Sequence, residues 1–358
     1  MAKNGTMTHR ERVEAVLRRQ KPDRVPSWPI IMGFTTVYTG TTIGSYYNKP
    51  EVAMAALKKT AEDFDFILWP FTGCAASLAW EFGGDMKWPT GDFAQAPTVT
   101  RYPVEKPEDV FKLEVPNVKT AGFAPIGFEF YKLAAQERLD NEPFNVTNMI
   151  GGPFTLGANI PGAEMFSKWL LKRPEAAHRL LRLATDYLHE YAQIVKNMFG
   201  IDGVIPFVGE PTSANQIISP KQFEDFVVPY TKELCDKVLD MGYKHIYVHI
   251  CGEQNLNLPQ WAKINFGDPG IIGTPHEIEL EKMAEYFPDD VILGNLEPAI
   301  IQSGTVDEVY EATRAVVEKG KALKNGYIFC QGCELPPMAP VENVKAMQQA
   351  VEDYGWYD

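Results

Sequence analysis

The segment Lys244–Gly252, with the sequence KHIYVHICG, decides how the fold is read. Its residues alternate with the period of two that is typical of a β-strand. An edge strand with one face in water would alternate in the same way, but such a face usually carries Lys, Glu and Thr. We therefore interpret the polar face as the floor of a functional site. The aliphatic face holds Ile246, Val248 and Ile250, and the polar face holds His245, Tyr247, His249 and Cys251.

Short apolar segments and amphipathic helices alternate on both sides of this strand. About eight such βα units, without a Gly-x-Gly-x-x-Gly fingerprint, favour a closed (β/α)8 barrel of the TIM type over an open doubly wound sheet. We expect one α/β domain of this kind over residues 1–358. The other predicted strands lie at 28–32, 64–69, 144–149, 203–208, 271–273, 291–294 and 327–330. Predicted helices lie at 50–62, 127–138, 164–171, 174–199, 219–241, 280–286 and 305–319, with one helix opening at Thr8 and a last one at Pro340.

The region from Thr72 to Thr120 is irregular and rich in Gly, Pro and Trp. Loops of this length in a compact domain are usually functional or decorative insertions, and we expect these and other N-terminal helical and loop insertions to cover the barrel mouth. A hairpin is predicted at 80–88. Core packing accounts for most aromatic side chains in most proteins, but several here fall in segments expected at the mouth. The tryptophans concerned are Trp28, Trp69, Trp80 and Trp88.

Composition excludes several classes of partner. The chain has 358 residues, is 45% hydrophobic, and carries a formal charge of -13, which argues against nucleic acid or an anionic membrane as the main partner. No apolar run reaches the roughly 18–20 residues needed to span a membrane, and the first residues lack the apolar region of a signal peptide. Five cysteines do not suggest a secreted disulfide framework. We expect a cytoplasmic protein whose thiols are free to bind metal.

Two strand ends carry candidate metal ligands. In a barrel of this type the polar face of each strand points inward, and chemistry takes place at the carboxyl ends of the strands. His249 and Cys251 lie at one such end, and Cys330 and Cys333 lie at or just past the end of the last strand. Catalytic zinc often has three protein ligands and one open position. A buried thiol beside a turn thiol, or a redox pair, are the alternatives for the two later cysteines.

Several segments resemble the uroporphyrinogen decarboxylase superfamily, over nearly the whole chain and most strongly in its second half. They are THRERVEAVLRRQKPDRVP (8–26), SPKQFEDFVVPY (219–230), HICG (249–252), GNLEP (294–298) and GCELPPMAPVENVKAM (332–347). This resemblance implies a distorted (β/α)8 barrel. One branch of the superfamily decarboxylates a tetrapyrrole without a metal and carries an Arg-Gln-Ala-Gly-Arg-Tyr segment near its N-terminus. The corresponding residues 26–40 read PSWPIIMGFTTVYTG, without an arginine, so we expect the other branch, the corrinoid methyltransferases.

That branch implies zinc on His249, Cys251 and Cys333, a corrinoid protein as partner, and a small methylated substrate. Cys330 is extra to the pattern and leaves open which thiol binds. Coordination to zinc either deprotonates an acceptor thiol or makes the metal a Lewis acid for a leaving heteroatom. His249 and Cys251 would thus take part in catalysis. Glu210, just past a strand end, is a further catalytic candidate as an acid or polar orienter, and a loop glutamate in water is its alternative reading.

We predict demethylation of an aryl methyl ether as the reaction, because aromatic residues are frequent near the expected mouth and no arginine cluster is there to hold an anion. The first alternative is a methylcobamide:thiol methyltransferase of the coenzyme M type. Uroporphyrinogen decarboxylase, a non-catalytic barrel that docks a corrinoid protein, and a hydrolytic zinc barrel are further alternatives. Metal content separates the docking barrel from the enzymes, and dependence on a corrinoid separates the methyltransferase from the hydrolase.

Overall fold

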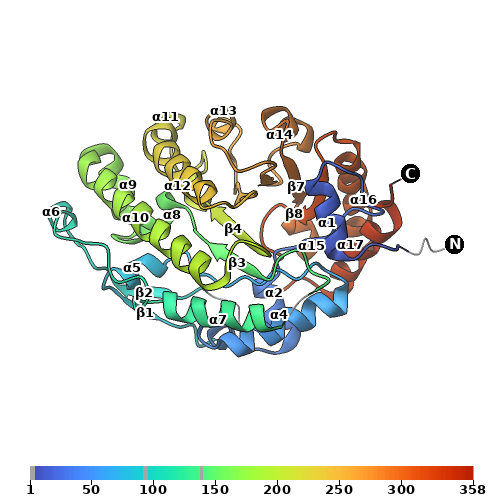
Figure 1. The fold of residues 1–358 in the computed structure, drawn as a ribbon, viewed down its shortest axis with the longest axis horizontal. Coiled ribbons are helices and arrows are strands. Elements are labelled where there is room, and N and C mark those ends of the chain that lie inside the picture. The colour runs from blue at the N-terminus through green and yellow to red at the C-terminus, as the bar shows by residue number, and fades with distance from the viewer. Residues whose placement is uncertain (1–4, 92–95, 138–139, 358) are drawn as a thin grey trace.

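A parallel β-sheet forms the centre of the computed structural model, which describes residues 5–91, 96–137 and 140–357. Its six strands follow one another in sequence order, and each pairs in parallel with the next (Figure 1). Parallel neighbours joined by helices place all the carboxyl ends at one edge of the sheet. The strands are β3 (Val146–Met149), β4 (Val204–Gly209), β5 (Tyr247–His249), β6 (Ile271–Gly273), β7 (Val291–Leu296) and β8 (Tyr327–Gln331).

Two irregular segments continue the sheet beyond β8. The amide of Phe329 donates to the carbonyl of Pro26 at 2.8 Å, and the amide of Trp28 donates to the carbonyl of Phe329 at 2.8 Å. Next to this segment, the amide of Ile67 donates to the carbonyl of Ser27 at 2.9 Å. The sheet thus reaches eight positions, which confirms the predicted TIM-type α/β barrel.

The predicted first two strands, 28–32 and 64–69, have the right positions but are not regular strands. Proline has no amide hydrogen to donate to a neighbouring strand; Pro29 lies within the first segment, Pro26 precedes it, and Pro70 follows the second. Met32, predicted to end the first strand, instead begins helix α2, and Phe64 ends helix α4.

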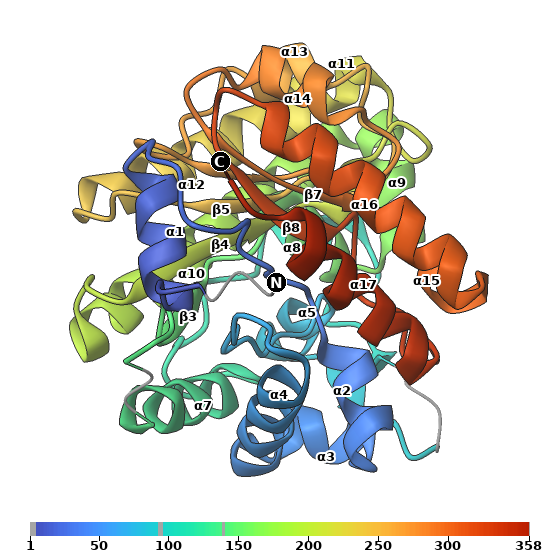
Figure 2. The same cartoon turned by 90° about the vertical axis from the view of Figure 1, so that its right-hand side faces the viewer.

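Helices surround the strands on all sides, as seen in Figure 2 toward the end that carries α1 and both termini. Three helices begin with capping boxes, in which Thr8, Ser219 and Thr305 each accept a hydrogen bond from the third helical amide. In the first half the helices are α1 (His9–Leu17), α2 (Met32–Thr39), α3 (Ile43–Asn48), α4 (Pro50–Phe64), α5 (Ser77–Glu81), α6 (Pro107–Val110), α7 (Ala124–Gln136), α8 (Pro153–Asn159) and α9 (Ala163–Lys172). They continue with α10 (Pro174–Phe199), α11 (Pro220–Gln222), α12 (Val228–Asp240), α13 (Leu258–Trp261), α14 (Leu280–Tyr286), α15 (Pro298–Ser303), α16 (Val306–Ala322) and α17 (Val341–Tyr354), with short η1 (Pro211–Ser213) and η2 (Phe223–Val227).

The predicted hairpin at 80–88 is wrong. Trp80 lies in helix α5, which is followed by a turn at Gly83, whose φ of 100° favours glycine. The strand that follows, β1 (Asp85–Lys87), pairs antiparallel with β2 (Thr98–Arg101), so the partner strand lies further along the chain. The predicted end of the helix at 127–138 lies outside the described residues.

The two faces of β5 pack as the alternation predicts. Ile246, Val248 and Ile250 join the core between the sheet and the helices, whereas Tyr247 belongs to the core inside the barrel. There its ring lies 5.6 Å from that of Trp28 and 5.3 Å from that of Trp69. Within the described residues, no helix is both long and apolar enough to cross a membrane.

Candidate functional site

The ends of β5 and β8 bring three candidate metal ligands together. His249 is the last residue of β5, Cys251 follows two positions later, and Cys333 lies two positions after β8 ends. One ligand atom from each of them lies within 4.8 Å of the other two, and the two sulfur atoms are 3.9 Å apart. In the part of the chain that the structure describes, no other His, Cys, Asp or Glu residues meet in this way.

This geometry fits zinc. Thiolate sulfur binds zinc at about 2.3 Å, so two sulfurs at a tetrahedral angle lie about 3.8 Å apart. The observed 3.9 Å between Cys251 and Cys333 matches that spacing without rearrangement. An imidazole and two thiols are also a ligand set that zinc commonly takes. All three residues are half-buried and line the cavity described below, so a zinc ion held by them would be accessible to a ligand in that cavity.

The two thiols are already coupled. The hydrogen bond from Cys251 lowers the pKa of Cys333 against the opposing effect of burial, and His249 lowers it further. The same hydrogen bond, followed by burial, raises the pKa of Cys251. These opposite shifts favour a thiolate at Cys333 over one at Cys251, and a thiolate in this half-buried place would suit a cation.

Cys330, the extra thiol of the predicted pattern, lies apart from the cluster. Its side chain is fully buried inside the barrel, and its sulfur lies 3.6 Å from the amide oxygen of Gln331. Burial raises its pKa. Of the two later cysteines, the geometry therefore brings only Cys333 to His249 and Cys251.

Glu334, beside Cys333, is a site residue that sequence reasoning missed. Its Oε1 accepts a hydrogen bond of 2.5 Å from the amide of Gly33, in the first turn of α2. A Cβ at position 33 would lie 2.9 Å from that oxygen, so this approach requires glycine. Burial raises the pKa of Glu334 to about 7. The position of an acid directly after a candidate ligand in GCELPP is the sequence signal that would have identified it.

Glu210 lies in a buried environment that the sequence did not predict. Its side chain is fully buried, so the reading as a loop glutamate in water is wrong. The carboxylate accepts hydrogen bonds from the amides of Phe154 at 3.0 Å and Thr155 at 2.7 Å, at the first turn of α8. Burial raises its pKa to about 7, against the lowering effect of these bonds. Glu210 is not among the residues that line the cavity, and its catalytic role stays a prediction.

A cavity of about 400 Å³ opens beside the cluster and is lined mostly by apolar side chains. Trp69, Phe71 and Tyr47 are among its aromatic walls, whereas Trp28 is packed inside the barrel. Its charged lining residues are acids, Glu81 and Glu334, and no lysine or arginine is among the described lining residues. A cavity of this size and composition suits a small, largely apolar ligand without negative charge.

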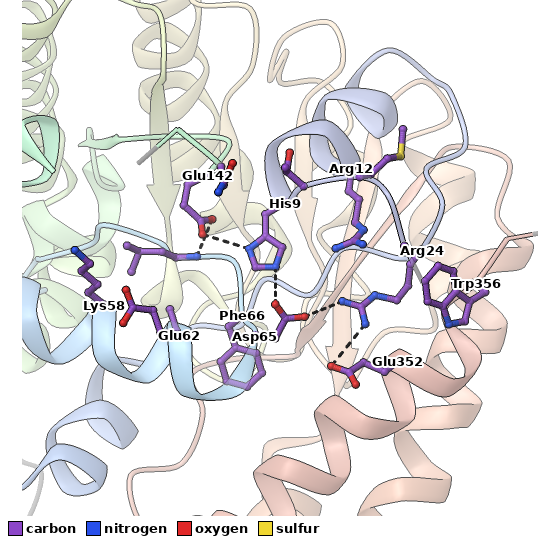
Figure 3. Close-up of a pocket in the computed structure, with 16 residues that line it drawn as sticks. His9, Arg12, Arg24, Lys58, Glu62, Asp65, Phe66, Glu142, Glu352 and Trp356 are labelled. Carbon is purple, nitrogen blue, oxygen red and sulfur yellow. Dashed lines mark hydrogen bonds and ion pairs between the residues drawn. The ribbon is translucent and has the colours of Figure 1, made fainter. Parts of the chain in front are cut away.

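A second cavity, of about 660 Å³, is lined by charged side chains that form ion pairs with one another (Figure 3). His9 of α1 lies 3.3 Å from Asp65 and 3.2 Å from Glu142, and Arg24 pairs with Asp65 at 3.0 Å and with Glu352 at 3.6 Å. These charged groups thus bind one another and tie α1 to the loop after α4 and to α17. Val13 and Val16 of the same helix pack into the interior of the barrel.

The sequence is similar to those of known methyltransferases and decarboxylases, and the fold to that of a methyltransferase. The family model described as uroporphyrinogen decarboxylase (URO-D) matches residues 8–354. A methylcobamide:CoM methyltransferase, MtbA, of Methanosarcina acetivorans is 28% identical, with 97% of this chain and 98% of the relative covered. A uroporphyrinogen decarboxylase of Christiangramia forsetii is 27% identical, with coverage of 70% and 71%. The solved structure of a methyltransferase from Methanosarcina mazei has the same fold, with a TM-score of 0.80, 21% identity and coverage of 97% and 99%.

Proposed function

We propose a function from the premise that the chain belongs to the uroporphyrinogen decarboxylase family. The protein is a zinc-dependent methyltransferase that moves a methyl group between a small methylated substrate and the cobalt of a corrinoid carried by a partner protein. The observation that carries this proposal is the cluster of His249, Cys251 and Cys333 at the wall of an apolar cavity. The methyltransferase relative, covered over 98% of its length, supports it.

Three side chains of this site would hold zinc, and the cavity would hold the substrate against it. Zinc bound there supplies a Lewis acid for the heteroatom that carries or receives the methyl group. The apolar walls exclude water, which strengthens electrostatic effects at the reacting atoms. Glu334, fixed by the amide of Gly33, places a second acidic group next to the ligand Cys333.

Decarboxylation of a tetrapyrrole fits this cavity poorly. Such a substrate carries several carboxylates, and each needs a cation or several hydrogen-bond donors once it leaves water. The described lining residues include no lysine or arginine to pair with these carboxylates, and the two acids Glu81 and Glu334 offer them no positive charge. A corrinoid methyltransferase therefore agrees better with the charges of the site than the family's decarboxylase does.

Demethylation of an aryl methyl ether is the reaction that we favour. Trp69, Phe71, Tyr47 and Phe207 line the cavity and offer flat apolar surfaces to an aromatic ring. A phenolate leaves reluctantly, so its developing charge needs an electrophile at the oxygen. Transfer to a thiol of the coenzyme M type is the second candidate, supported by the name and the full-length match of the methyltransferase relative. Against it stands the absence of a cation for a sulfonate among the described lining residues.

A corrinoid protein would dock over the carboxyl ends of the strands. Three large apolar side chains are exposed in loops that follow β4, β5 and β8: Ile217 by 54%, Leu256 by 65% and Met338 by 55%. Exposed apolar residues at the rim of a site favour contact with another protein. Docking there would bring the cobalt to the cavity.

The test mixes zinc-loaded protein with a cobalt(I) corrinoid protein and a panel of methoxyphenols, methylamines and methyl thioethers. Methylcobalt formation is followed by visible absorbance. We expect transfer from at least one methoxyphenol, loss of transfer in Cys251→Ser, and retention in Cys235→Ser, a buried thiol of α12 outside the cluster. Activity only from methylcobalt to a thiol would reject the demethylase direction. Absence of corrinoid-linked transfer in both directions would reject the function.

A further inference from the structure

Glu81 is a buried acid in the wall of the apolar cavity. It is the last residue of α5, its side chain is 7% exposed, and Ser77 donates a hydrogen bond of 3.4 Å to its Oε2. Gly122 packs against it so closely that a Cβ there would lie 2.6 Å from Cγ of Glu81. The side chain is thus held in place without a cationic partner among the described residues.

A second polar group lies at the same place. Tyr187 of α10 also lines the cavity and is 1% exposed, and its hydroxyl is hydrogen-bonded to the carboxyl group of Glu81. Ser77 and Tyr187 orient this carboxyl group, which keeps the capacity for a further hydrogen bond that a ligand in the cavity can take.

Glu81 is separate from the cluster of candidate ligands. The group of atoms from His249, Cys251 and Cys333 that lie within 4.8 Å of one another does not include a carboxylate oxygen of Glu81, although all four residues line the same cavity. Glu81 comes from α5, whereas the cluster comes from the ends of β5 and β8. A ligand that fills the cavity can therefore meet the cluster and Glu81 with different atoms.

We propose that Glu81, oriented by Tyr187 and Ser77, binds a neutral hydroxyl group of the substrate at a part of the cavity wall separate from His249, Cys251 and Cys333. This inference rests on the proposed function and names the substrate class: an aryl methyl ether that also carries a phenolic hydroxyl. A hydroxyl both donates and accepts, so it can bond the carboxyl group in either direction. A carboxylate in its place would lie near acids without a cation.

The protonation of Glu81 agrees with a neutral ligand. Burial raises its pKa to about 8, against the lowering effects of Tyr187 and Ser77. At pH 7 the group is therefore mostly a neutral carboxylic acid, which offers hydrogen bonds but no charge to an ammonium group.

The experiment measures binding without corrinoid, so that it is independent of methyl transfer. Zinc-loaded protein is titrated calorimetrically with 4-methoxyphenol, 4-methylanisole, 4-methoxybenzoate and 4-methoxybenzylamine, four ligands of similar size that differ at one position. We expect 4-methoxyphenol to bind about 10-fold more tightly than each of the others, the effect of one or two net hydrogen bonds.

Two variants test the residue itself. Glu81→Leu should weaken binding of 4-methoxyphenol by about 10-fold while leaving 4-methylanisole unchanged, because leucine cannot bond the hydroxyl. Glu81→Gln should change the affinity for 4-methoxyphenol by less than about 3-fold, because an amide both donates and accepts. Zinc content and urea unfolding report whether each variant is folded. If the leucine variant is not folded, the affinities of the four ligands and of Glu81→Gln still test the proposal.

Several results would overturn the proposal. They are tightest binding of the benzylamine, tightest binding of the benzoate, an unchanged affinity for 4-methoxyphenol in Glu81→Leu, and a loss of that affinity in Glu81→Gln as large as in the leucine variant. Failure of all four ligands to bind would also reject it. Methyl transfer from a different donor class, measured separately, would leave the proposed function standing.

Discussion

The pH dependence of stability should reveal the ion pairs that fix α1. Burial lowers the pKa of His9, but its hydrogen bonds with Asp65 and Glu142 outweigh that effect and raise the pKa from 6.5 to about 9. The difference corresponds to about 3 kcal/mol, at about 1.4 kcal/mol for each pH unit. Because the folded-state pKa is the higher one, this stabilisation is complete below pH 6.5 and is lost as the pH rises through about 9.

The variant His9→Gln removes the charge while keeping a polar side chain. Urea unfolding of both proteins from pH 5.5 to 10.5 should show the wild type more stable by about 3 kcal/mol at pH 6, with the difference close to zero at pH 10. Taking the difference cancels the titration of groups that both proteins share.

His189→Gln is the matched control. Burial lowers the pKa of His189, so this residue is neutral in both states above pH 7. The stability difference between wild type and this variant should therefore stay constant from pH 7 to 10. A difference for His9→Gln that is also constant over that range, or that grows with pH, would refute the role given to the His9 ion pairs.

Three further predictions concern the site. Cys251→Ser and Cys333→Ser should each lose zinc by metal analysis while Cys235→Ser keeps it, and full zinc in both site variants would contradict the ligand assignment. Glu210→Gln should lower the free energy of unfolding by about 1–3 kcal/mol in urea, because its amide donors would face the amides of α8; an unchanged midpoint would contradict this. Leu256→Asp should slow methyl transfer with the corrinoid protein but not with free cobalamin, and equal slowing with both would argue against docking at this loop.

Sequence pattern predicted those parts of the fold in which every second residue has the same environment. In β5 the aliphatic face packs on helices, whereas Tyr247 lies inside the barrel, so the period of two follows from two faces with different surroundings. The first two barrel positions were predicted less well, because backbone hydrogen bonds there depend on where Pro26 and Pro29 interrupt the ladder. A pattern of hydrophobic residues does not show that these backbone hydrogen bonds are missing.

The metal-ligand cluster was predictable because strand order and direction determine where strand ends meet. Glu334 and Glu210 were not, since the partner of each comes from a distant part of the chain. Gly33 lies 301 positions before Glu334, and Phe154 lies 56 positions before Glu210. An acid at a strand end can face a cavity or bond the first turn of a helix, and the choice depends on which backbone amides the fold brings near it.

In the proposed function, substrate choice and methyl-transfer chemistry depend on different elements of this barrel. The cluster comes from the ends of β5 and β8 and would have to keep the distances that one zinc ion requires. Glu81 and Tyr187 come from α5 and α10 and need only present suitable polar groups to the cavity. Substitutions at these two positions should therefore change which molecule binds without changing zinc content. An acceptor that carries a sulfonate would require a cation in such a place, and the described lining residues of this chain supply a carboxyl group and a tyrosine instead.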